Sequence, residues 1–240
     1  MKMLFAVALV LVGLVPASIA DAVPVVTTAF RLVQADTDQD SSTATSGVFN
    51  ESAASLVPPE EGIANATQTS DIQPSVFQGT GQADVVDPGA HDARSVFQVA
   101  FSLSAPHQLT GNVNLSAEAA LAEARARFDL SGPTTISLGA ASGSPPFLPD
   151  TETAVINTLL NPGNYFLDVR ATSTMSGQFG GGGGGSNFDF AVTFTPVAAV
   201  PEPATLSLLL LAGAGVAVMR RRRLRRGRVG SSASGLDPSL

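Results

Sequence analysis

Residues 97–105 read Phe-Gln-Val-Ala-Phe-Ser-Leu-Ser-Ala, and apolar side chains occupy every second position of this stretch. Successive side chains of a β-strand point to opposite faces, so the alternation predicts a strand with one buried and one exposed face. The same period of two recurs in residues 113–117, 165–172 and 188–195, between stretches of Gly, Pro, Asn or Ser. Together these patterns predict an all-β fold of antiparallel strands.

Residues 116–130 present a conflict between composition and period. Their Ala, Glu, Leu and Arg content favours a helix. However, the apolar residues from Ala122 to Leu130 alternate with Glu123, Arg125, Arg127 and Asp129. A helix with this pattern would carry charge on every face, so we predict a strand.

The remaining segments are predicted from their turn-forming residues. Asn161-Pro162-Gly163 predicts a hairpin turn, because proline fixes φ and glycine permits positive φ. The six glycines at 180–185 predict a flexible loop between two strands. Residues 34–92 are rich in Ser, Thr, Asp and Gln, so we predict a loop-rich segment, with weak outer strands at 25–33 and 75–86 as the alternative.

The N-terminus has the features of a secretory signal peptide. Residues 1–20 contain Lys2, an apolar run over 3–15, and the small residues Ser18 and Ala20 before the expected cut. This interpretation implies the Sec translocon and signal peptidase as partners. A buried N-terminal helix is the alternative.

The C-terminal region combines a proline-rich motif, an apolar stretch and a basic cluster. The motif is Pro201-Glu202-Pro203, and residues 204–219 contain no charge. The cluster consists of Arg220, Arg221, Arg222, Arg223, Arg225 and Arg226. Sixteen helical residues span about 24 Å, against a hydrocarbon core of about 30 Å, so the stretch predicts a short transmembrane helix. The arginines would place the tail in the cytoplasm. A core helix with a basic tail and a nucleic-acid-binding arm are the alternatives.

Charge is divided unevenly along the chain. The net charge is −7, yet residues 21–200 contain 5 Arg, no Lys and 18 acids, which gives −13. Such an acidic segment argues against binding to nucleic acid. The absence of Cys excludes disulfides and thiol chemistry.

Two groups of residues are candidates for metal binding. Asp36, Asp38 and Asp40 have the spacing of the first ligands of a calcium loop, although Ser41 stands where that loop needs glycine. We favour a solvated acidic loop without a cofactor, with a Ca²⁺ site at these three aspartates as the alternative. The second group lies around Pro88 and consists of Asp84, Asp87, His91 and Asp92, for which a polar turn is the alternative.

The sequence offers little for catalysis. It has neither a Gly-x-Ser-x-Gly nor a His-Glu-x-x-His motif, and it contains only 2 His. A carboxylate pair of the glycosidase type stays open. We expect a protein that is not an enzyme.

The C-terminal motif, apolar stretch and arginine cluster together resemble the PEP-CTERM sorting signal of Gram-negative bacteria. The resemblance implies that an exosortase recognises Pro201, Glu202 and Pro203 and cleaves nearby. It also implies a mature protein at the cell surface or in the extracellular matrix, in contact with exopolysaccharide or other envelope components, in a structural or adhesive role. A glycan- or Ca²⁺-binding module and a secreted hydrolase are the alternatives.

The exported part resembles, more loosely, the two-layer β-sandwich ectodomains of such proteins and pre-peptidase C-terminal-like jelly rolls. The 97–103 strand, the corner at Phe128–Gly132 and the turn at 160–165 carry this resemblance. The expected organisation is a signal peptide (1–20), a β-sandwich domain (21–196, with core strands mostly at 93–196), a linker (197–203), a helix (204–219) and a cytoplasmic tail (220–240).

Overall fold

Twelve β-strands make up the regular structure of the residues that are described, and none of those residues is helical. The computed structural model describes residues 23–55, 62–86, 89–143, 148–177 and 182–197. The predicted signal peptide, the Pro201–Pro203 motif, the 204–219 helix and the arginine cluster lie outside these residues. A search of the described residues finds no helix with the length and apolar character needed to span a membrane.

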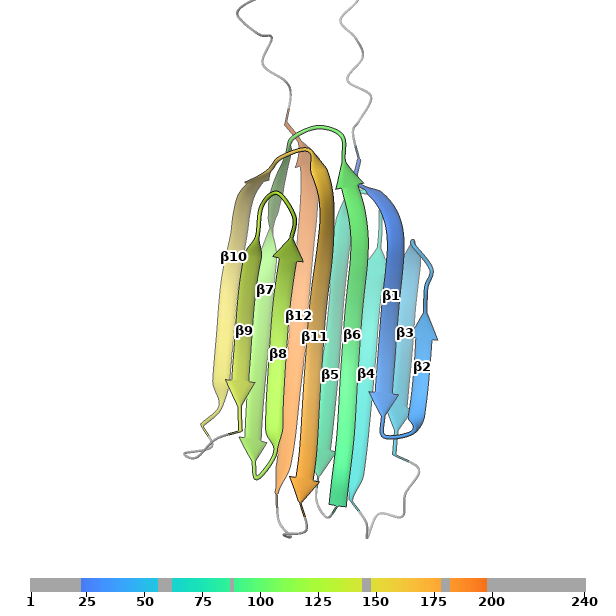
Figure 1. The fold of residues 1–240 in the computed structure, drawn as a ribbon, viewed down its shortest axis with the longest axis vertical. Helices are drawn as coiled ribbons and strands as arrows, with labels where there is room; N and C mark the ends of the chain where they lie inside the picture. Colours follow the sequence, from blue (N-terminus) through green and yellow to red (C-terminus); the bar gives the residue numbers. More distant parts are fainter. Residues whose placement is uncertain (1–22, 56–61, 87–88, 144–147, 178–181, 198–240) are drawn as a thin grey trace, which may run out of the picture. The chain divides into compact units, whose positions relative to one another are not determined.

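The strands form two six-stranded antiparallel sheets, called sheet A and sheet B (Figure 1). Sheet A contains, in spatial order, β2 (Asp38–Ser42), β1 (Val25–Ala35), β6 (Gly89–Leu103), β11 (Gly163–Gly177), β8 (Glu123–Ser131) and β9 (Ile136–Ser142). Sheet B contains, in spatial order, β10 (Asp150–Leu160), β7 (His107–Ala120), β12 (Gly183–Pro196), β5 (Val76–Val86), β4 (Ile63–Ile72) and β3 (Gly47–Ala54). The predicted all-β two-layer sandwich is thus confirmed.

The strand pairing from β5 onward is that of a jelly roll. β5 pairs with β12, β6 with β11, β7 with β10, and β8 with β9, so the chain runs out and back as one long antiparallel ribbon. The ribbon is folded over so that β5-β12-β7-β10 and β6-β11-β8-β9 lie in opposite sheets. The first four strands extend the two sheets, with β1 and β2 beside β6 and with β3 and β4 beside β5.

The inward-facing residues of the two sheets form one hydrophobic core, as the period of two predicts. Phe97, Val99, Phe101 and Leu103 of β6 are buried, and the alternate residues of β11 and β12 are buried with them. The aromatic rings meet edge to face across the sandwich. For example, the ring centroids of Phe97 and Phe190 are 5.0 Å apart.

Residues 116–130 are strand, as the alternation predicts, but in two pieces that belong to different sheets. β7 ends at Ala120 in sheet B, and β8 begins at Glu123 in sheet A. Leu121 has a φ of 62° at the crossing, where its side chain is exposed. Two of the four inward positions of β8 are alanines, Ala124 and Ala126, and the other two are Phe128 and Leu130.

The prediction of a loop-rich segment over 34–92 is wrong, and the alternative of outer strands at 25–33 and 75–86 is found instead, as β1 and β5. β2, β3, β4, β5 and the start of β6 fill most of that range. Many of their inward positions hold small or polar residues, such as Ala64, Ala66 and Ser70, among a few large ones such as Phe49 and Phe77, so the hydrophobic pattern is weak. Gly81 shows why small residues are required, because a Cβ atom there would lie 2.3 Å from the ring of Phe188.

Two of the predicted loops also differ in the structure. The Asn161-Pro162 turn does not close a hairpin; it links β10 of sheet B to β11 of sheet A. Gly183, Gly184 and Gly185 belong to strand β12 rather than to a loop, because they pair with both β5 and β7. In both cases the long-range pairing of strands overrides the local turn signal.

Carboxylates from one sheet cap the free edge of the other on both sides of the sandwich. Glu152 and Asp150 of β10 accept hydrogen bonds from the backbone N–H groups of Gly139 and Ala141 on β9, the edge strand of sheet A. On the opposite side, Asp38 of β2 accepts from the N–H of Ala54, at the end of β3. Such capping occupies donors that would otherwise pair with another chain.

Candidate functional site

The outer face of sheet A carries every exposed arginine of the described residues. Successive strands place Arg94 on β6, Arg170 on β11, and Arg125 and Arg127 on β8. The strand register sets these residues in rows across the sheet. One row runs Leu32–Val96–Arg170–Arg127, and the next runs Gln34–Arg94–Thr172–Arg125. Since the segment as a whole is strongly acidic, its positive charge is concentrated on one face.

Asp168 is the hub of the charges on this face. Its Oδ1 accepts hydrogen bonds from Nε of Arg170 at 2.7 Å and Nε2 of Gln98 at 3.1 Å, and its Oδ2 accepts from Arg127. The Asp168 side chain is only 9% exposed. Arg170 and Arg127 lie directly opposite each other on neighbouring strands, and the Asp168 carboxylate between them offsets the repulsion of like charges.

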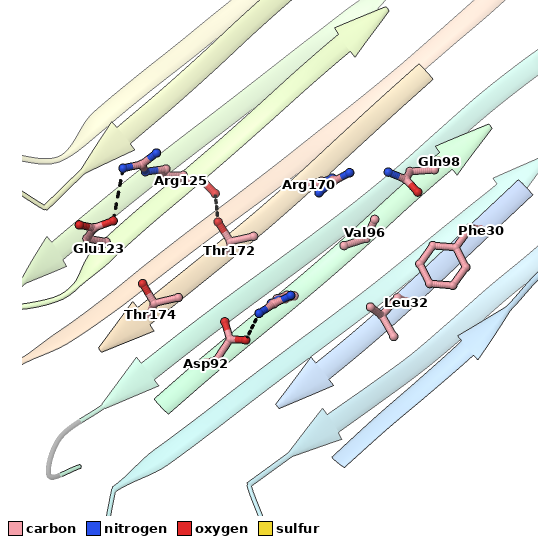
Figure 2. Close-up of a pocket in the computed structure, with 11 residues that line it drawn as sticks. Phe30, Leu32, Asp92, Val96, Gln98, Glu123, Arg125, Arg170, Thr172 and Thr174 are labelled. Atoms are coloured by element: carbon pink, nitrogen blue, oxygen red, sulfur yellow. Dashed lines mark hydrogen bonds and ion pairs between the residues drawn. The ribbon is translucent and has the colours of Figure 1, made fainter. Parts of the chain in front are cut away.

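A groove crosses the four strands β1, β6, β11 and β8 next to this hub (Figure 2). Its volume is about 450 Å³. The lining residues are Phe30, Leu32, Asp92, Arg94, Val96, Gln98, Glu123, Arg125, Arg170, Thr172 and Thr174. Val96 faces outward by its place in the strand, yet it is only 5% exposed, so it forms the floor between the longer side chains.

The groove combines polar, charged and apolar side chains. The arginine side chains are partly exposed, from 36% for Arg170 to 69% for Arg125. Phe30 is 37% exposed at the β1 end. The lining contains three arginines and two acids, a net charge of +1, within a segment whose net charge is −13. This groove is therefore suited to a ligand that offers negative charge or hydroxyl groups.

Two hollows on the outer face of sheet B have the opposite charge. One, of about 660 Å³, lies over Gly183–Gly185 and is lined by Asp84 and Glu118. The other, of about 310 Å³, is lined by Asp71 and Asp189. Burial raises the pKa of Asp84, and a hydrogen bond from Gln82 offsets part of that rise. Neither hollow is lined by a basic residue.

The three aspartates predicted as calcium ligands make separate contacts. Asp36 binds His91, with 2.8 Å between Oδ2 and Nδ1, and its Oδ1 accepts from the N–H of Asp92. Asp38 caps β3, and Asp40 accepts from the N–H of Ser41. Among the described residues, no three acidic or histidine side chains are arranged to hold a metal ion. Calcium binding by Asp36, Asp38 and Asp40 stays a prediction that rests on their spacing in the sequence.

The pKa of Asp36 reflects this local network. Burial alone would raise it, but hydrogen bonds from Asp92, His91 and Ser55 outweigh burial, and the net result is a lowered pKa. The residues of the second predicted metal group also have separate partners. His91 contacts Asp36, Asp92 forms an ion pair with Arg94, and Asp84 accepts a hydrogen bond from Gln82. Asp87 lies outside the described residues.

Sequence reasoning missed the buried Arg31. Its side chain lies inside the sandwich, where it donates to the carbonyl oxygens of Gly47 and Ala44 and lies over the ring of Phe49. Desolvation lowers the pKa of Arg31, although arginine keeps its charge in proteins. Its position at an inward site of β1 was the available signal. The groove itself was also missed, because it needs side chains from four strands.

Comparison with known proteins identifies the C-terminal signal and little else. Residues 199–226 match the PEP-CTERM protein-sorting motif. No curated protein matches the sequence. The structure of TmCBM61 in complex with beta-1,4-galactotriose is similar over 60% of this chain and 85% of that chain, at 12% identity and a TM-score of 0.23. A structure of infectious bursal disease virus, Gx strain, is similar over 77% of this chain and 59% of that chain, at 11% identity and a TM-score of 0.22. Likenesses at this level carry no inference about function.

Proposed function

Because residues 199–226 carry a PEP-CTERM protein-sorting motif, which indicates an exported protein processed by an exosortase, we propose that the mature chain works at the cell surface or in the extracellular matrix. Its role there is structural or adhesive. The sorting motif is the observation that carries this proposal. The N-terminal signal peptide, read by the Sec translocon and signal peptidase, would start the export.

The C-terminal signal would act as a temporary anchor. Residues 204–219 are too few to cross a typical hydrocarbon core comfortably, since they span about 24 Å as a helix. The arginine cluster at 220–226 would hold the far end in the cytoplasm. Pro201-Glu202-Pro203 would then lie just outside the membrane, where exosortase could cut and release the folded domain.

Several features of the β-sandwich support a role in a surface layer. Both edges of the sandwich are capped by carboxylates, which limits pairing between strands of neighbouring molecules. The domain is strongly acidic, which favours solubility and repels other acidic surfaces. We propose that the protein has this structural or adhesive role and no catalytic activity. Turnover of any substrate in a panel of esters, peptides and glycosides would contradict this proposal.

Substitutions in the signal test the proposal. Glu202→Ala, or deletion of Arg220–Arg226, is expected to leave an unprocessed precursor in the membrane fraction, detected by a tag placed after residue 197. Deletion of residues 227–240 is the matched control, because it shortens the tail but keeps both the motif and the arginine cluster. Normal processing of the Glu202→Ala protein would contradict recognition of the motif.

Glycan binding is the second candidate function, and the groove on sheet A is the observation that favours it. The groove presents arginine, threonine and glutamine side chains beside an exposed phenylalanine. Sugar hydroxyls and ring faces fit side chains of these two kinds.

A further inference from the structure

We propose that the groove on the outer face of sheet A binds a carboxylated polysaccharide, with Arg94, Arg125 and Arg170 as the carboxylate-binding residues. This inference rests on the adhesive role proposed above and names its ligand class. It is drawn from the charge, shape and composition of the groove in Figure 2.

Charge complementarity favours binding of an anionic ligand in this groove rather than in either hollow of sheet B. The groove has three arginines and two acids, whereas the hollows of sheet B are lined by acids and no bases. Guanidinium groups bind carboxylates through two parallel hydrogen bonds, so three of them along one groove can engage three carboxylates of a repeating polymer. A polymer with one carboxylate per sugar has a lower charge density than nucleic acid, so the acidic remainder of the segment repels it less.

The arginines keep donors available for a ligand. A guanidinium has five N–H groups, and each ion pair of these three residues engages one nitrogen. Arg125 and Glu123 are paired at 3.3 Å, and their side chains are 69% and 63% exposed. Such an exposed pair is weak and readily exchanged for a ligand. Figure 2 shows Arg125 and Arg170 on opposite sides of Thr172, with Thr174 farther along the same strand.

The rest of the groove fits a sugar chain rather than an acidic peptide. Phe30, Leu32 and Val96 form an apolar strip that can contact the C–H faces of sugar rings, and Gln98, Thr172 and Thr174 can bind hydroxyl groups. The groove crosses three inter-strand spacings, about 14 Å, which suits several sugar units in a row. A peptide would more readily add to a sheet edge, and here the edges are capped.

Binding of polygalacturonate to the protein purified from the cells that export it tests the proposal. Titration calorimetry is expected to show binding that weakens as salt rises, and at least tenfold weaker binding to the fully methyl-esterified polymer, whose carboxylates are blocked. The double variant Arg94→Gln/Arg125→Gln is expected to lose at least tenfold in affinity.

The single variant Arg125→Gln is expected to weaken binding at least threefold, and Arg127→Gln is its matched control. It removes the same charge from the same strand and face as Arg125, but Arg127 does not line the groove. Equal loss in this variant, equal binding of the methyl-esterified polymer, tighter binding of polyglutamate, or no binding of polygalacturonate by the wild type would each overturn the proposal. Processing at the sorting motif is measured separately, so failure here would leave the proposed export and release intact.

Discussion

Replacement of Asp168 by asparagine is predicted to destabilise the sandwich through the outer face of sheet A. The substitution keeps the size of the side chain but removes the negative charge that lies between Arg127 and Arg170. It also turns one acceptor oxygen into an amide N–H₂ group that faces a guanidinium. The two arginines, directly opposite each other on neighbouring strands, would then repel more strongly, with only Asp129, 3.6 Å from Nε of Arg127, left as a counter-charge.

The expected cost is about 2 kcal/mol of the free energy of unfolding, because a hydrogen bond to a charged group contributes about 1.5–3 kcal/mol and an exposed ion pair about 0.2–1 kcal/mol. Asp168 is 9% exposed, but its arginine partners are 36% and 46% exposed, so water will satisfy them in part. For a domain of this size, about 2 kcal/mol corresponds to a fall in Tm of about 4–8 °C.

Urea unfolding followed by circular dichroism measures the change, with Glu123→Gln as the control. Glu123 also pairs with an arginine on the same face, but its side chain is 63% exposed. Loss of such an exposed pair is expected to cost about 0.5 kcal/mol at most. If Asp168→Asn and Glu123→Gln lower the free energy of unfolding equally, the buried Asp168 contributes no more stability than an exposed ion pair. That result would contradict the role of Asp168 as the hub of this face.

Three further predictions concern the core, the pH dependence of stability and the sheet edge. Gly81→Ala is expected to cost about 1–3 kcal/mol in urea unfolding, since an added Cβ overpacks the core. That Cβ would lie 2.3 Å from the ring of Phe188. The control Gly139→Ala is expected to be near neutral, because a Cβ there would lie 3.6 Å from its nearest atom. Equal urea midpoints for the two variants would contradict this packing. The pKa of Asp36 is lowered on folding, so its contribution to stability is present above about pH 4, the unfolded value, and is lost as the pH falls through the folded value. Asp36→Asn should therefore flatten the acid decline of Tm, and a curve parallel to the wild type would count against it. Glu152→Ala uncaps the free edge of β9 and is expected to raise self-association in light scattering, so an unchanged particle mass would argue against the capping role.

The strands that the sequence predicts best are those with large inward residues. Phe97 to Leu103 and Phe188 to Phe194 alternate clearly, and their outer faces are polar, so a period of two is visible without knowledge of any partner. β4 has the same geometry but buries Ala64, Ala66, Gln68 and Ser70 before Ile72, so its pattern resembles that of a polar loop. Large rings on the neighbouring strand of the same sheet, such as Phe188 of β12 beside Gly81 of β5, take up the space next to such small residues.

The groove and the hub could not be predicted from local sequence. The carboxylate of Asp168 and its partner Arg127 are separated by 41 residues, and the strand register alone makes them neighbours. Likewise, Arg94, Arg125 and Arg170 come from three strands that follow the folding of the jelly-roll ribbon. Alternation does predict that each faces outward, but it does not predict which strands lie side by side.

Export and C-terminal processing are tested by the intact mass and the location of the mature protein. We expect a protein recovered outside the inner membrane whose mass lacks residues 1–20 and everything beyond a cut at or near Pro201–Pro203. A protein that stays in the cell with residues 204–240 still attached would contradict this expectation.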